Sequence, residues 1–424
     1  MRIRNPHPVL RSFSLFCFLI MCRQFGFSQA SDSLVHVEHA DTLVGSEMEG
    51  EQVRELIGHV KIRHGTTIIT CNQAIQYLQS NRVSLLGDVT VNDDTMQMLT
   101  MRGMYYEKDR TAEGFDQVIV HDGGTTIRSK YGKYYRNEQK AYFKTKVSVV
   151  DSGSTLISDE LTYYRDQMNS FADGNVTIVN KANKLTLYGD HFENYKKKKY
   201  SIMIKNARGI EIDTSGTAQP ETLFVKSDTL QAYQDTLERL EATGNVHILR
   251  TEFWSNAGFA IFFTKLDSIL MERSPISWYA QSSKETTQVS GDTIFVKLNQ
   301  HKLRTLYVNG SAFAVSQADS VLRKRFNQMS GQTITMNFVD NAIHQVDVDR
   351  TATMLYYVYN GDKPDGMNVT SGDHGRIMFK TKKIDKIKMS GGVEGKFYPE
   401  KMLLGHESDY NLMGFTWKTQ APIR

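Results

Sequence analysis

The chain has 424 residues, 40% of them hydrophobic, with 51 Lys and Arg against 47 Asp and Glu. It is long enough to bury a large core, and its small basic excess indicates no nucleic-acid partner. The excess lies entirely in the first thirty residues, which hold four arginines and no acids, so 47 basic and 47 acidic residues remain beyond them.

The first thirty residues have the pattern of a secretory signal peptide. Three arginines flank or precede an apolar run over residues 12–22, and small residues at Ser28 and Ala30 suit a signal peptidase. The run is too short to span a membrane. Met21, directly before Cys22, disfavours lipidation, since a lipoprotein signal needs a small residue there. We predict an exported, periplasmic protein, with association to the outer membrane as a further location.

Cysteine usage excludes an intramolecular disulfide. Cys17 and Cys22 leave with the signal peptide, so Cys71 alone stays in the mature chain. An exported protein is free to form disulfides, but this one has no second thiol. Its stability must come from burial and backbone pairing.

A repeat of 29 residues organises the chain that follows. Short alternating words begin at this interval, at Val60, Val89, Val118, Val147 and Val176. The same interval separates Tyr77, Tyr106, Tyr135 and Tyr164, and also Ile69, Met98, Ile127 and Leu156. Three landmarks in phase indicate stacked repeat units.

The sequence of each repeat unit predicts short β-strands separated by turns. Alternation places Val60 and Ile62 on one face and Lys61 and Arg63 on the other. Turns are expected at Gly58-His59, Gly87-Asp88 and Gly174-Asn175, because glycine, and Asp or Asn after it, tolerate positive φ.

After Val176 the repeat loosens. We expect regular β-repeats over residues 31–212, then a degenerate continuation of the same stack over 213–424, with insertions and a C-terminal cap. One stretch, Ser316 to Asn327, is predicted to be helical. The fold class is all-β: an elongated stack of two packed sheets, on the order of 50–100 Å long, because each unit can bury its apolar face only against its neighbours.

Several words also resemble a known family. "HADTLVG", "LIGHVKIRHG", "CNQAIQY" and the repeated "GNV.I" and "SD.L.Y" resemble the OstA-like, or LptA-like, family of periplasmic lipopolysaccharide-transport bridge proteins. "IDKIKMSGGVEGKFYPE" followed by "LMGFTWK" resembles its longer Bacteroidetes-type members.

The resemblance implies a twisted, half-open β-jelly roll with an apolar lumen. It implies a carrier and not an enzyme, which needs no cofactor and shields the acyl chains of lipopolysaccharide, or a related glycolipid, on their way to the outer membrane. It also implies partners: other OstA-like or LptA-like proteins, or further copies of the chain, joined through sheet edges.

A groove lined by the repeated apolar residues would offer such a lumen. These residues are Val60, Ile62, Val89, Val91, Val118, Val120, Val147, Val149, Val176 and Ile178. Each buried methylene of a lipid contributes about 0.8 kcal/mol. The competing interpretation is an ordinary packed core, since alternating valines usually serve packing.

Other motifs carry weaker functional signals. Lys196, Lys197, Lys198 and Lys199 form either an exposed turn or a contact to lipid A phosphates. The repeated tyrosines form either a structural ladder or a sugar-binding stripe. No catalytic or metal-binding group is predicted, since His36 and His39 should point to opposite faces of a strand. Two alternatives remain: an enzyme acting on acidic polysaccharide, and a structural envelope scaffold with a packed interior.

Overall fold

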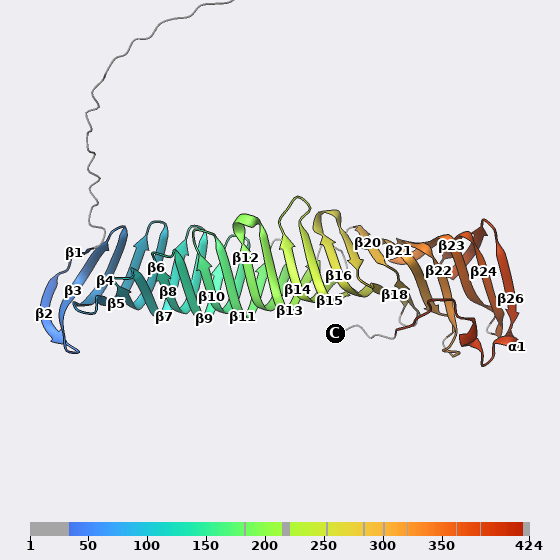
Figure 1. Cartoon of the computed structure of the whole chain (residues 1–424), viewed down its shortest axis with the longest axis horizontal. Helices are drawn as coiled ribbons and strands as arrows, with labels where there is room; N and C mark the ends of the chain where they lie inside the picture. Colours follow the sequence, from blue (N-terminus) through green and yellow to red (C-terminus); the bar gives the residue numbers. More distant parts are fainter. Residues whose placement is uncertain are drawn as a thin grey trace, which may run out of the picture.

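The computed structural model describes residues 34–181, 184–213, 221–251, 253–282, 285–299, 302–319, 321–361, 363–381 and 383–418. The predicted signal peptide and its cleavage site lie outside these ranges. The described chain forms one antiparallel sheet of 26 strands, arranged as a long body (Figure 1). Most consecutive strands pair with one another, so the chain is largely an up-and-down meander, with pairings that skip a strand at both ends and over residues 253–317. The expectation of an elongated, all-β stack of the jelly-roll type is confirmed.

The first half of the stack comprises β1 (Val35–His39), β2 (Thr42–Met48), β3 (Glu51–His64), β4 (Thr67–Tyr77), β5 (Arg82–Asp93), β6 (Met96–Tyr106), β7 (Thr111–Asp122), β8 (Thr125–Tyr135), β9 (Lys140–Val150), β10 (Ser154–Tyr164), β11 (Asn169–Asn180), β12 (Leu185–Tyr195) and β13 (Tyr200–Asp213). The second half comprises β14 (Glu221–Tyr233), β15 (Arg239–Leu249), β16 (Phe253–Phe263), β17 (Ser268–Glu272), β18 (Ile276–Ser282), β19 (Glu285–Ser290), β20 (Thr293–Asn299), β21 (Lys302–Gln317), β22 (Phe326–Val339), β23 (Ala342–Asn360), β24 (Lys363–Lys380), β25 (Lys383–Ser390) and β26 (Glu394–Pro399). The helical turns are short: η1 (Lys196–Lys198), η2 (Thr264–Leu266), α1 (Glu400–Leu403) and η3 (Glu407–Tyr410).

Each regular repeat consists of two long strands, not the several short strands that the sequence predicted. The glycine pairs that were expected to be turns between strands lie in the middle of β3, β5 and β11. At these points the strand register shifts, for example between Leu86 and Val89 on β5, while pairing resumes on both sides. The pairs are therefore bulged corners, which bend each strand without ending it.

The corner conformation recurs along the whole stack. Two consecutive residues have positive φ at positions 58–59, 87–88, 145–146, 174–175, 205–206, 244–245, 273–274, 310–311, 350–351 and 391–392, and Asp116 has it alone on β7. These corners align from strand to strand, so the sheet is folded along a line. The two halves of each strand then face each other across one interior, which replaces the predicted pair of separate sheets.

A side chain from the neighbouring strand holds several corners. The Asn72 amide nitrogen lies 3.1 Å from the Asp88 carboxylate, and the Asn175 amide nitrogen lies 2.8 Å from the carboxylate of Asp159. Asp190 accepts a bond from Asn206 in the same way, at 2.7 Å. A corner thus requires a residue that tolerates positive φ and a short polar partner on the next strand.

The outer face carries an aromatic and cationic ladder. Tyr77, Tyr106 and Tyr135 lie on every second strand, roughly 9.5 Å apart, too far for direct ring contact. Cations fill the gaps: Lys133 lies 5.7 Å from the Tyr106 ring and 5.1 Å from that of Tyr135, and Arg82 lies 4.3 Å from Tyr77. Farther along, both strands of a repeat supply aromatics, and direct contacts run through Tyr164, Phe171, Tyr195, Tyr200 and Tyr233.

The helix predicted over residues 316–327 is wrong. β21 continues to Gln317 and β22 begins at Phe326. Between them the Asp319 carboxylate accepts the backbone N–H groups of Val321 and Leu322 at 2.6 and 2.9 Å, which fixes a turn.

After α1, the chain runs back along the outside of the stack towards β18 (Figure 1). Two buried glutamines hold this C-terminal strap, residues 404–418. Gln288 donates to the carbonyl of Thr416 at 2.7 Å and accepts the N–H of Lys418 at 2.9 Å. Gln328 accepts the N–H of Leu412 at 2.9 Å. The "LMGFTWK" phrase is therefore a docked segment whose backbone is recognised by side chains of the sheet.

The corner geometry predicts a sharp difference between two glycines. Gly174 has φ +76°, and a Cβ there would lie 2.5 Å from the Asp159 carboxylate, whereas a Cβ at Gly153 meets nothing within 4 Å. We expect Gly174→Ala to lower the free energy of unfolding by about 2 kcal/mol, because left-handed backbone disfavours a Cβ. Gly153→Ala should change it by less than about 0.5 kcal/mol. Urea denaturation followed by circular dichroism measures both, and equal effects would contradict the corner assignment.

Candidate functional site

All ten residues predicted to line the groove lie in one apolar interior. Eight are buried, namely Val60, Ile62, Val89, Val91, Val118, Val120, Val147 and Val176. Val149 and Ile178 are only partly buried against the same cluster. The cluster runs from Leu56 to Ile377, so apolar side chains line the inside of the fold without interruption along nearly the whole stack.

This interior is filled by its own side chains. In the first five repeats the cavity found inside it has a volume of about 10 Å³. That volume holds about one water molecule. It is lined by Met96, Val120, Ile127 and Phe143, among others, and Tyr134, Asp122 and Arg165 border it. Any lipid chain that enters must therefore push the two halves of the sheet apart.

The side opposite the corners is closed by polar contacts, which we call the seam. Here two rows of hairpin turns meet, and a side chain of one row reaches the other. Asp93, at the end of β5, accepts hydrogen bonds from the Tyr134 hydroxyl and from the Arg136 Nε, both at 2.8 Å. The Asp93 side chain is 0% exposed and that of Arg136 is 25% exposed. The aspartate lies beneath, and the arginine lies towards solvent.

The same contact recurs one repeat later. Arg165 Nε donates to Asp122 at 3.2 Å, and its Nη2 donates to Thr95 at 2.6 Å. One repeat earlier, Tyr105 bonds to His64 across the seam at 2.8 Å, and Arg110 donates to the His64 carbonyl at 3.0 Å. Three consecutive repeats are thus closed at His64, Asp93 and Asp122, which lie 29 apart in the sequence. Arg136 and Arg165 keep the same interval, whereas Arg110 does not.

These contacts end at the next repeat. Asp151 occupies the position equivalent to Asp93 and Asp122, but it binds the N–H groups of Gly153 and Ser154 in its own turn, at 2.9 and 2.7 Å. Burial opposes its ionisation, yet these hydrogen bonds lower the pKa of its carboxyl overall. The interior is less tightly covered near this turn, since Val149 is only partly buried.

The tyrosines of the seam are strongly desolvated. Burial raises the pKa of Tyr105 to about 12. Burial and the hydrogen bond to Asp93 raise the pKa of Tyr134 as well. Both hydroxyls therefore stay protonated at neutral pH and act as hydrogen-bond donors.

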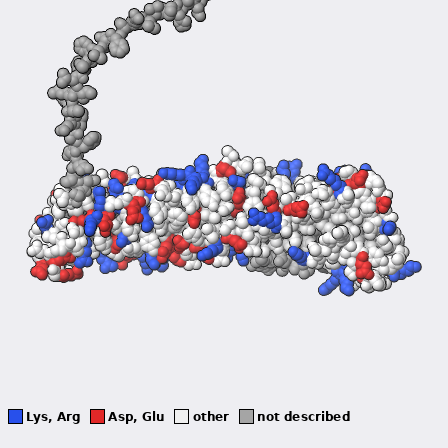
Figure 2. Space-filling view, viewed as in Figure 1, with Lys and Arg blue, Asp and Glu red and all other residues white. Residues whose placement is uncertain are grey.

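The lysine run lies on the same row of turns as Arg136 and Arg165. Lys196–Lys198 form η1, and Lys199 has left-handed backbone that leads into β13. Lys197 bonds to the carbonyl of Asp166, and Lys198 lies 5.1 Å from the Tyr195 ring. Figure 2 shows that charges of both signs gather over the N-terminal half of the visible face, while the C-terminal half is mostly uncharged.

The seam was missed from the sequence. Its signal was nevertheless present, since Asp93, Asp122 and Asp151 keep the repeat interval, and so do Arg136 and Arg165. The pattern does not indicate that these two series touch, because the contacts join residues 43 apart through the fold.

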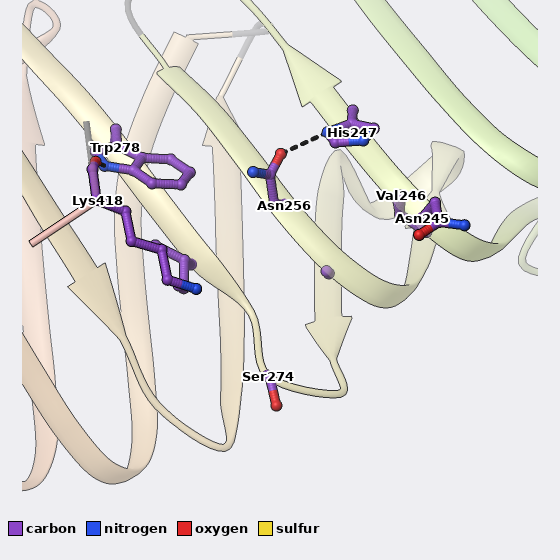
Figure 3. A pocket seen from close by; sticks show the side chains of 9 residues that line it. Asn245, Val246, His247, Asn256, Ser274, Trp278 and Lys418 are labelled. Atoms are coloured by element: carbon purple, nitrogen blue, oxygen red, sulfur yellow. Dashed lines mark hydrogen bonds between the residues drawn. The ribbon is translucent and has the colours of Figure 1, made fainter. Parts of the chain in front are cut away.

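A second cavity, of about 210 Å³, lies beside the end of the strap (Figure 3). His247 and Asn256 form one wall, joined by a hydrogen bond of 2.7 Å. Trp278 and Lys418 form another, where the indole N–H donates to the Lys418 carbonyl at 3.2 Å. Trp278 also stacks on Trp254, with ring centres 6.2 Å apart.

In the described ranges, no three or more His, Cys, Asp or Glu side chains lie together in a way that could hold a metal ion. His39 bonds to Asp41 at 3.3 Å, and Cys71 is free and buried. Among the same residues, no helix is long and apolar enough to cross a membrane.

Residues 32–190 match the family model described as "OstA-like protein". This part of the chain is similar to OstA-like proteins. The match covers the regular repeats, including the corners of β3, β5 and β11 and the whole polar seam. No curated protein matches the chain. A similar solved structure is that of LptH, the LptA-homologous periplasmic component of the lipopolysaccharide transport device from Pseudomonas aeruginosa. It is 15% identical, with 34% of this chain and 84% of that chain covered, at a TM-score of 0.17.

The seam predicts a stability difference between adjacent aspartates. Asp93→Asn keeps the shape but removes the charge that Arg136 and Tyr134 bind, and should lower the free energy of unfolding by about 1.5–3 kcal/mol. Asp94, whose side chain is 55% exposed, lies 3.9 Å from the same arginine, and Asp94→Asn should change it by less than about 0.5 kcal/mol. Thermal or urea unfolding compares the two variants. A neutral Asp93→Asn would show that the seam contact contributes nothing to closure.

Proposed function

We propose that this protein is a periplasmic carrier that holds the acyl chains of lipopolysaccharide, or a related glycolipid, in its interior and bridges their transport to the outer membrane. The observation that carries the proposal is the uninterrupted apolar cluster between the two halves of the folded sheet. The similarity of residues 32–190 to OstA-like proteins supports the choice of lipopolysaccharide. No step requires a cofactor or a catalytic residue.

The energetics of the interior suit a moving ligand. Each methylene transferred from water gains about 0.8 kcal/mol. The side chains that would receive it are the same at each repeat, mostly valine, isoleucine and methionine. Such a lining supplies affinity without a preferred position, so a lipid could advance from one repeat to the next at little cost.

The ends of the stack suit assembly. Among the described strands, β1 and β2 pair only with β3, and β25 and β26 pair only with β24. Leu43 on β2 and Phe397 on β26 are about half exposed. We propose that these terminal strands pair with another OstA-like or LptA-like protein, or with a second copy, so that interiors join end to end.

A second candidate is a structural scaffold of the envelope. It is favoured by one observation, the packed interior, in which eight of the ten predicted lining residues are buried. A scaffold would keep this interior closed at all times, whereas a carrier must open it.

Photo-crosslinking in cells separates the two candidates. A photo-crosslinkable residue at Val149 or Ile178 should capture lipopolysaccharide, because these interior positions are only partly covered. The neighbouring Ser148 and Thr177, which point to the opposite face of the strand, serve as matched controls and should capture none. Equal yields at inward and outward positions, or no lipid at any of them, would favour the scaffold.

The lysine run offers a separate test of headgroup binding. We propose that Lys196, Lys197, Lys198 and Lys199 contact phosphates of lipid A, since they lie at the edge of the seam where the interior is less covered. Replacing all four with serine should leave the unfolding midpoint nearly unchanged, because the turn is exposed, but should reduce lipid crosslinking at Val149 several-fold. Unchanged crosslinking would remove the phosphate role and leave the carrier role intact.

A further inference from the structure

The seam contacts combine features that a purely structural closure does not need. Asp93 is a fully buried carboxylate, and burying a charge costs several kcal/mol before its partners offset that cost. Apolar side chains would close the same gap at least as firmly. A buried ion pair is therefore weak evidence for a role in stability. Because the seam is closed by pairs of charged side chains, another anion can replace the aspartate as the partner of the arginine.

Arg136 is placed to meet an incoming anion before Asp93 does. Arg136 is partly exposed above the buried Asp93, and it also reaches Thr66 at 3.3 Å. Arg165 likewise bonds to Asp122 and Thr95, although its side chain and that of Asp122 are equally exposed, at 16%. A phosphate suits such a guanidinium because it can accept two parallel hydrogen bonds.

Apolar space lies directly beneath. The small interior cavity is bordered by Tyr134, Asp122 and Arg165 and is lined inside by Met96, Val120 and Phe143. An anion held at the arginines would thus have its alkyl chain close to a small cavity in the packed interior.

We infer that Arg136 and Arg165 form a binding site for the anionic group of an amphiphile, which takes these arginines from Asp93 and Asp122 and so opens the seam to its alkyl chains. The inference rests on the proposed function, since it requires that the interior accept hydrocarbon. It adds the place of access and the two arginines that would hold the anionic group. The exchange is non-covalent, and each arginine keeps one anionic partner throughout.

The test measures binding of dodecyl phosphate to the full chain by calorimetry, below its micelle concentration, with dodecyl maltoside as the uncharged match. Asp93→Asn with Asp122→Asn leaves the arginines without their competitor, and should tighten dodecyl phosphate binding at least about fivefold. The double change Arg136→Gln and Arg165→Gln should weaken it by a similar factor. The dissociation constant of dodecyl maltoside should stay within about twofold of the native value in every variant. A larger change shared by both amphiphiles would report a general loosening of the seam.

Controls keep the outcome interpretable. Glu160→Gln breaks an outer-face pair with Lys144, 3.0 Å long, and should behave as the native protein. Asp122→Asn alone serves if the double aspartate variant does not fold, as judged by circular dichroism. If both amphiphiles bind and neither affinity changes in the aspartate or arginine variants, the seam site is wrong. The carrier function would not be contradicted by that result. Binding of neither amphiphile to any folded variant would overturn both.

Discussion

The left-handed corner in the middle of every second strand is the constraint on which this structure depends. Without it, the meander would be a flat ribbon with one face of valines in water. Where two consecutive residues have positive φ, as at Gly174 and Asn175, the strand bends sharply. The apolar side chains of the two halves of that strand then face each other. The cost of the unusual backbone is offset locally by glycine and by a short Asp or Asn on the next strand. A repeated local device thus creates a continuous interior.

Folding a sheet along a line leaves an open side, and the two kinds of closure differ in strength. The corner side is covalently continuous. The seam is held only by side chains, and in the first repeats these are charged and hydrogen-bonded. In the proposed carrier, the corner side would act as the hinge and the seam would be the side that opens. This asymmetry fits a carrier, because hydrocarbon can enter along one side while backbone pairing between strands stays intact.

Much of this architecture could be predicted from the sequence, and the failures have physical causes. Alternation in words such as Val60 to Ile62 identified strands and their inward faces, and the interval of 29 residues identified the stack. The sequence alone does not distinguish these corners from turns between strands, because Gly-Asp has the same backbone preference in a corner and in a turn. Only the pairing register of the strands distinguishes the two. The helix over residues 316–327 failed because an aspartate-capped turn ended the periodic pattern. The seam was not found because its contacts join residues 41–46 apart, and nothing local shows which turns meet. The docking of the strap on Gln288 and Gln328 is hidden for the same reason.

The most direct test of the account is the width of the seam with and without lipid. Spin labels at Gly124 and Gln167, exposed residues two positions beyond the seam partners Asp122 and Arg165, would report it by double electron–electron resonance. The account requires the distance between the labels to lengthen when lipopolysaccharide binds, because buried side chains occupy the interior that an acyl chain would enter. Bound lipopolysaccharide with an unchanged distance would contradict it.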